Sequence, residues 1–228
     1  MTMDPLVLLT DVDRATEELL RTAADLDPAA VSAPSLLPGW TIGHVLTHLA
    51  RSADAYTSML TWARTGMDTE AEPADLAAGA KRPLREQVED LRLAHERFAD
   101  AGAAMTAAAW TLRLPSTGRS AGIIPWERLR EVEVHHVDLG DRYTPSDWSE
   151  AFALRLLREI ATGAGDDWPP MELRPFGIDH PVRIGATENP PVIGGPTKSL
   201  AAWLAGRADG ADLTVSPDGE LPTPARWK

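Results

Sequence analysis

Apolar side chains recur at intervals of three and four residues through several long segments of this 228-residue chain. This spacing predicts amphipathic helices, because residues three or four apart lie on one face of an α-helix. We expect helices over 4–26, 42–64, 83–104 and 146–162, and one more over 123–140. In the first helix the expected buried positions are Leu6, Leu9, Val12, Ala15, Leu19, Ala23 and Leu26. The chain is therefore expected to form a helical bundle.

Local signals set the ends of these helices and the connections between them. Thr41 is a suitable N-cap for the second helix, and Gly66 is expected to end it. Residues 67–82 are rich in Ala, Asp, Glu and Pro and are interpreted as an exposed connector, and 110–120 as a short strand or irregular crossover. His95, in the third helix, is expected at the surface.

The composition changes after residues 163–167, which are interpreted as a linker. Short apolar pieces follow with Pro and Gly between them, MELRPF, VRIG, PPVIGG and DLTVS, and one helix is expected over 198–208. This pattern predicts a small α+β domain. We expect a mainly α protein with a helical bundle at 1–164 and the small domain at 165–228.

The charge and the residue types absent from the chain exclude several classes of function. A formal net charge of −12 and a pI near 4.9 argue against a nucleic-acid partner, although an anionic small substrate could still bind a local Arg or Lys. No membrane span or signal peptide is expected. The chain has no cysteine, so thiolate ligands and a cysteine nucleophile are excluded and a cytoplasmic location is the simplest expectation.

Two expected helices carry pairs of possible metal ligands. Glu131 and His135 lie one turn apart, as do His44 and His48. Inward His and Glu side chains from facing helices can hold a metal, and a His₂Glu set suits a catalytic zinc with one open position. The spacing does not choose between His44 and His48, and it favours His135 over His136 only because Glu131 shares its face. The alternative is that these side chains pack, cap or meet solvent.

Three stretches carry a resemblance to a known family. They are LPGWTIGHVLTHLARSADAYTSMLTWARTG, WERLREVEVHHVDLG and LAAWLAGRADGADLTVSPDGELPTPARW, in this order along the chain. Together they resemble the mycothiol-dependent maleylpyruvate isomerases, a branch of the DinB-like metal-binding four-helix bundles. The resemblance implies a DinB-like four-helix bundle followed by a small α+β C-terminal domain that contributes to the active site.

The family pattern also implies the site residues. His48 matches the first metal-ligating histidine of the family, and Glu131 and His135 match its other two ligands. The metal is divalent, typically zinc, and His44 and His136 are then neighbours of the site. Arg207 matches a family arginine that serves the active site, although an arginine near a helix C-terminus can also simply interact with the helix dipole.

The implied reaction is the cis–trans isomerisation of maleylpyruvate to fumarylpyruvate, a step of gentisate-type aromatic degradation. Mycothiol would supply the sulfur, because the chain has none in cysteine. One alternative is a mycothiol S-transferase that acts on another electrophilic small molecule. Others are a non-catalytic DinB-like binding or stress module, and a plain helical bundle in which the His and Glu pattern is accidental.

Overall fold

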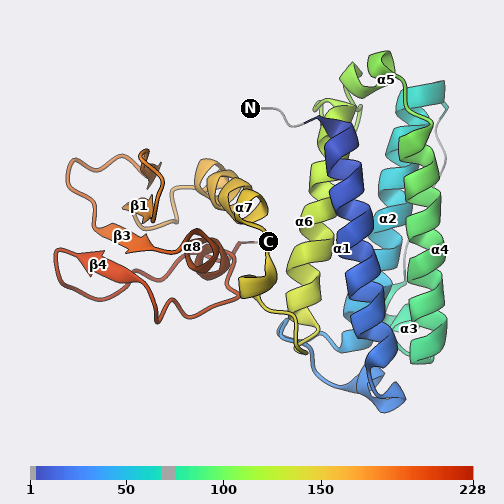
Figure 1. The fold of residues 1–228 in the computed structure, drawn as a ribbon, viewed down its shortest axis with the longest axis horizontal. Coiled ribbons are helices and arrows are strands. Elements are labelled where there is room, and N and C mark those ends of the chain that lie inside the picture. The colour runs from blue at the N-terminus through green and yellow to red at the C-terminus, as the bar shows by residue number, and fades with distance from the viewer. Residues whose placement is uncertain (1–3, 68–74, 228) are drawn as a thin grey trace. The chain divides into compact units, whose positions relative to one another are not determined.

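The chain folds into two compact units, Met1–Arg142 and Tyr143–Lys228 (Figure 1). The structure is a computed structural model that describes residues 4–67 and 75–227. Helices dominate it, and a small sheet occurs in the second unit, as the sequence predicts. None of the helices in these described ranges is long and apolar enough to cross a membrane.

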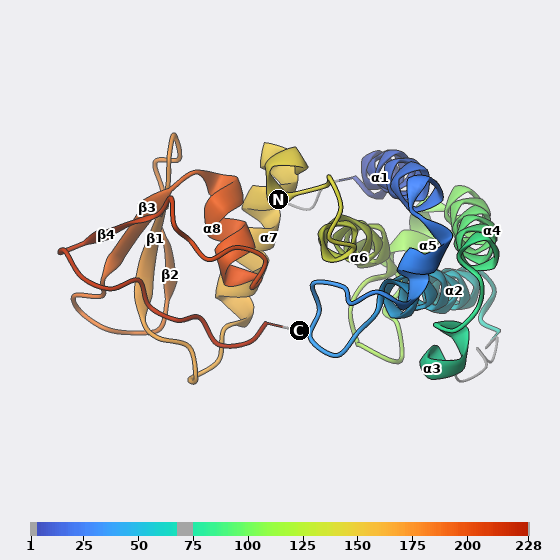
Figure 2. The ribbon, with the colours of Figure 1, turned by 90° about the horizontal axis from the view of Figure 1, so that it is seen from below.

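The first unit is a bundle of four long helices. They are α1 Pro5–Asp25, α2 Ile42–Thr65, α4 Leu84–Ala103 and α6 Ile124–Asp138. Each helix packs against two others, α2 on α4 and α6, and α1 on α6 and α4 (Figure 2). Shorter elements connect them, namely the 3₁₀ turns η1 Pro28–Ser32 and η2 Ala121–Ile123, and the helices α3 Leu76–Gly79 and α5 Ala107–Thr111.

Side-chain caps fix the ends of the bundle helices. The Asp4 carboxylate accepts a hydrogen bond from the backbone of Leu6 at the start of α1. Thr41 and His44 form a reciprocal capping box at the start of α2. Gly66 ends α2 with a φ of 73°, a left-handed conformation that favours glycine. The expected cap at Thr41 and the expected end at Gly66 are both confirmed.

The buried face of α1 agrees with the central part of the expected stripe, whereas Leu9 and Leu26 are only partly buried. Val12, Ala15, Leu19 and Ala23 are buried. Leu6, however, is 57% exposed, and Leu8 occupies the core position in its place. Residues 6–9 are all apolar, so periodicity alone could not choose among them.

Two expected connections can be compared with the structure. The 110–120 region begins in the last residues of the short helix α5 and contains one isolated bridge between Arg113 and Ser120. Of the two expected alternatives, the irregular crossover is therefore confirmed and the strand is not. The connector expected over 67–82 lies partly outside the described residues, and its described part includes α3.

The second unit combines two helices with a four-stranded sheet. The strands are β1 Met171–Pro175, β2 Val182–Ile184, β3 Val192–Gly195 and β4 Thr214–Ser216, in the order β2-β1-β3-β4. The central pair, β1 and β3, is parallel, and the two outer pairings are antiparallel. Helix α8, Thr197–Leu204, packs on β1 and β3. The four strand segments expected from the sequence are all present.

Helix α7, Glu150–Gly163, is grouped with the second unit. Its apolar residues pack against α8 and β2. The observed division therefore falls after Arg142, whereas the sequence expectation placed it after residue 164. The stripe of Phe152, Leu156 and Ile160 is buried as expected, but the stripe itself does not say which element covers it.

Candidate metal centre

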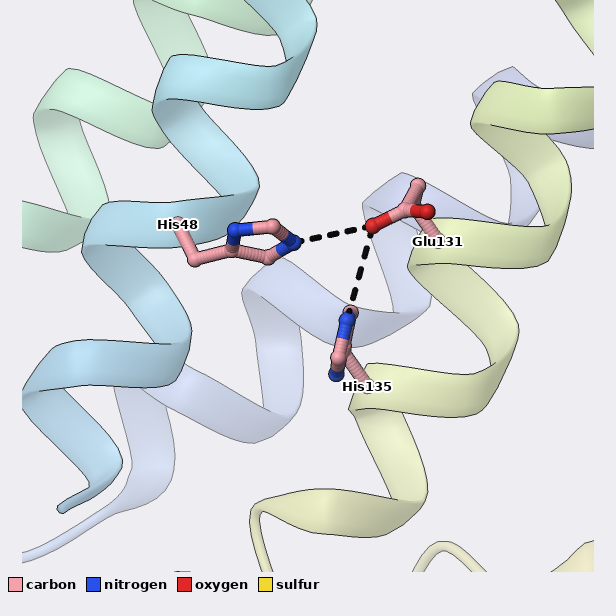
Figure 3. Close-up of side chains that lie close together, drawn as sticks. All are labelled: His48, Glu131 and His135. Atoms are coloured by element: carbon pink, nitrogen blue, oxygen red, sulfur yellow. Dashed lines mark hydrogen bonds and ion pairs between the residues drawn. The ribbon is translucent and has the colours of Figure 1, made fainter. Parts of the chain in front are cut away.

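Two neighbouring helices of the bundle bring together three possible metal ligands. His48 comes from α2, and Glu131 and His135 come from α6, where they lie one turn apart (Figure 3). One nitrogen or oxygen atom from each side chain lies within 4.8 Å of the others. Among the described residues no other cluster of His, Asp and Glu meets this spacing.

The Glu131 carboxylate is the centre of this cluster. His48 Nε2 donates a hydrogen bond to Glu131 Oε2 at 2.9 Å, and His135 Nε2 lies 3.4 Å from the same oxygen. The two imidazole rings meet edge to face with centroids 4.9 Å apart. Both histidines therefore direct Nε2 at one carboxylate oxygen, as Figure 3 shows.

Asp138 orients His135 from the other side of the ring. His135 Nδ1 donates a hydrogen bond of 2.8 Å to Asp138 Oδ2, and the Asp138 side chain is almost fully buried. A carboxylate bound to the far nitrogen fixes the tautomer and the ring orientation of a metal-ligating histidine. The sequence reasoning missed Asp138, although its position three residues after His135 was a usable signal.

The electrostatics of the cluster keep the carboxylate ionised. Burial alone would raise the pKa of Glu131, but hydrogen bonds and charge from His135 and His48 outweigh it and hold the pKa well below its ordinary value. Burial lowers the pKa of His135, whereas Asp138 and Glu131 together raise it above the usual value. Arg130 adds a further positive charge 3.6 Å from Glu131 Oε1.

The other two candidate histidines make different contacts. His44 Nδ1 accepts hydrogen bonds from the Thr41 backbone at 3.2 Å and the Thr41 hydroxyl at 2.8 Å, as part of the cap of α2. His136 is buried, and its Nε2 forms a 2.9 Å hydrogen bond with the Thr22 hydroxyl. Neither His44 nor His136 belongs to the cluster. The structure therefore distinguishes His48 from His44 and His135 from His136, which helical spacing alone could not do.

Trp40 packs beside the cluster. Its ring centroid lies 5.4 Å from that of His48 in an edge-on arrangement. The indole therefore restricts the His48 ring from one side, and it is partly exposed there.

His95 and Arg207 complete the residues that the sequence singled out. The expectation that His95 lies at the surface is wrong, because the residue is only 8% exposed. Its position on α4 faces α1, where Asp13 lies 3.4 Å away. Arg207 follows α8 in the second unit, and its Nη1 donates to the Ala205 carbonyl at 2.7 Å. Its part in the active site stays a prediction.

The residues present fit a divalent metal. Two imidazoles and one carboxylate are a ligand set used by catalytic zinc, and His135 already has the supporting carboxylate that such ligands require. Three protein ligands leave a position for an exogenous group. The fold and the cluster together define a helical-bundle protein with a candidate His₂Glu metal centre.

The family model described as the mycothiol maleylpyruvate isomerase N-terminal domain matches residues 12–140. The chain belongs to this family. Two solved structures cover 99% of this chain and 98% of their own with TM-scores of 0.88, one of a mycothiol-dependent maleylpyruvate isomerase at 27% identity and one of a histidine-to-alanine mutant of such an enzyme at 26%. No curated protein matches the chain significantly.

Proposed function

We propose that this protein is a mycothiol- and metal-dependent isomerase that converts maleylpyruvate to fumarylpyruvate. The strongest support is the convergence of His48, Glu131 and His135 within 4.8 Å, in a fold similar along its whole length to a mycothiol-dependent maleylpyruvate isomerase. The His₂Glu set favours zinc as the metal. We also infer a cytoplasmic location, where a small thiol is kept reduced.

The reaction needs rotation about a carbon–carbon double bond. A thiolate that adds to this bond forms a C–S bond and moves the electron pair toward the carbonyl, which leaves a single bond that can rotate. Expulsion of the thiolate then restores the double bond in the trans form and returns the thiol unchanged. Mycothiol supplies the sulfur in this proposal, because the chain has no cysteine.

The residues of the chain would serve this chemistry in distinct ways. A bound divalent metal would lower the pKa of a thiol at its open position. His48, Glu131 and His135 would hold the metal, and Asp138 would keep His135 directed at it. Arg207 would bind a substrate carboxylate or the negative charge that develops on the enolate, since a guanidinium can grip a carboxylate with two hydrogen bonds.

The amount of free mycothiol before and after the reaction tests the proposed reaction type. Purified protein with maleylpyruvate and mycothiol should yield fumarylpyruvate while the amount of free mycothiol stays constant. A stable mycothiol adduct of the substrate would instead indicate an S-transferase. Bound metal without any thiol-dependent turnover, over a panel of electrophiles, would indicate a binding module.

A further inference from the structure

Arg128 lies inside the bundle between the two helices that carry the candidate ligands. Its side chain is 0% exposed, and its Nη1 donates hydrogen bonds of 2.8 Å to the Leu49 carbonyl and to Ser52 Oγ. Ser52 Oγ in turn donates to the Leu49 carbonyl at 3.1 Å. Leu49 directly follows His48 on α2, so one buried guanidinium ties α6 to α2 beside the metal centre.

Arg128 and the candidate ligands make successive contacts along the α2–α6 interface. Arg128, Glu131 and His135 occupy one face of α6, three and then four residues apart. Ser52 lies one turn beyond His48 on α2. Arg128 contacts Ser52, and Glu131 contacts His48, so the guanidinium holds the helices together one turn away from the ligands.

Stability alone does not account for an arginine at this position. Burial lowers the pKa of Arg128 to about 10, so the group remains charged at neutral pH. Its Nε and Nη2 have no hydrogen-bond partner among the described residues. A buried charge with unsatisfied donors is costly, and well-packed apolar side chains often stabilise such positions better. The cost favours a role in placing the neighbouring groups.

We propose that Arg128 is a positioning residue that fixes α6 against α2, so that Glu131 and His135 already face His48 before a metal binds. This inference rests on the metal centre of the proposed function. Ligands from two separate helices bind a metal tightly only when the distance between the helices is held, and residues that support ligands commonly change metal affinity roughly 10- to 100-fold.

The sign of the change in affinity separates positioning from two other roles. If Arg128 acted mainly through its charge, its removal would strengthen the binding of a divalent cation, because like charges repel. If it only stabilised the fold, its removal would lower the melting temperature and leave the affinity of the folded protein unchanged. Positioning alone predicts weaker binding.

The experiment compares wild-type protein with Arg128→Met and Ser52→Ala, and with Gln87→Met as a matched control. Gln87 is also buried, and it joins α4 to α2 through Thr47 at 3.1 Å and bonds the Ala80 carbonyl at 3.3 Å. The substitution of Gln87 removes these buried hydrogen bonds, which lie outside the α2–α6 interface. The dissociation constant for Zn²⁺ is measured by competition with a chromophoric chelator. The visible spectrum of bound Co²⁺ reports the geometry of the ligands, and thermal melts report stability.

We expect Arg128→Met to bind Zn²⁺ roughly tenfold or more weakly, with an altered Co²⁺ spectrum. Ser52→Ala should show a smaller loss in the same direction. Gln87→Met should melt at a lower temperature with wild-type affinity and spectrum. If Arg128→Met does not fold, Ser52→Ala decides by itself, and wild-type affinity in that variant would overturn the inference.

Two further results have different meanings. Arg128→Met with wild-type or tighter Zn²⁺ binding would overturn the positioning role while leaving the metal centre intact. Wild-type protein that binds neither Zn²⁺ nor Co²⁺ would instead overturn the metal centre itself, and the role of Arg128 with it.

Discussion

At the scale of single residues, the site depends on one carboxylate oxygen shared by two imidazoles. Glu131 Oε2 lies 2.9 Å from His48 Nε2 and 3.4 Å from His135 Nε2. The sequence predicted Glu131 and His135 as a pair because their spacing is a property of one helix. The choice of His48 over His44 depends on the packing of α2 against α6 and on the cap formed by His44. Helical spacing alone predicts neither of these contacts.

Asp138→Asn tests the support of His135. The amide keeps the shape of the side chain but removes the negative charge from the group that accepts the hydrogen bond of His135 Nδ1. We expect Zn²⁺ to bind roughly 10- to 100-fold more weakly, as measured by chelator competition. Asp25→Asn, which removes an exposed carboxylate, should leave the affinity unchanged. Equal affinities in the two variants would contradict the assigned role of Asp138.

His95 should make the protein sensitive to mild acid. Burial, with a smaller contribution from Arg128, lowers the pKa of His95 to about 4, and Asp13, 3.4 Å away, is half exposed and therefore screened. The unfolded chain takes up the proton near pH 6.5 and the folded one only near pH 4, so the free energy of unfolding falls as the pH drops through that window. The full effect is on the order of 3 kcal/mol.

Urea unfolding at several pH values between 4 and 7 measures this effect. In His95→Leu the fall in stability over that window should be smaller than in wild-type protein. His180→Leu, at an exposed position, serves as the control and should keep the wild-type slope. Parallel slopes in wild-type protein and His95→Leu would show that another group controls the acid response.

At the scale of secondary structure, helix positions follow from apolar spacing and from caps. Thr41 and Gly66 bound α2 as the sequence predicts. In the first turn of α1 the expected burial of Leu6 is wrong, because Leu6, Val7 and Leu8 are all apolar and only packing selects Leu8. The short helices α3 and α5 were missed, since four or five residues are too few to show a helical period.

Gly66→Ala tests how α2 ends. Nothing lies within 4 Å of the position that a Cβ would take, so only the left-handed backbone disfavours alanine, by about 1 kcal/mol. Thermal melts should therefore show a lower melting temperature. Gly163→Ala is the matched control, because that site is equally open, does not have a positive φ and ends α7. Alanine there should be neutral or stabilising. A Gly66→Ala variant as stable as Gly163→Ala would rule out the left-handed cap.

At the scale of the whole chain, the sequence predicted a bundle followed by a small α+β unit but assigned the helix that became α7 to the bundle. An amphipathic helix shows that it has a buried face and not which element covers that face. In the structure α8 and β2 cover it, so α7 is grouped with the second unit. The family model matches 12–140, whereas the structural similarity extends over both units.

Arg207→Met tests whether the second unit contributes to catalysis. If Arg207 binds a substrate carboxylate or the developing enolate, kcat/KM should fall by roughly 100-fold or more while Zn²⁺ affinity stays at the wild-type value. Arg158→Met, at an exposed position of α7, should retain full activity. An equal, small effect of both substitutions would remove Arg207 from the proposed active site.

The most direct test of the proposed function is the rate at which maleylpyruvate is converted to fumarylpyruvate, followed by absorbance after the protein has been treated with a chelator. The proposal predicts no turnover without mycothiol and none after chelation. Activity should return in proportion to added Zn²⁺ in wild-type protein, and His48→Ala should not recover. Full activity in the chelated protein, or in the absence of mycothiol, would contradict it.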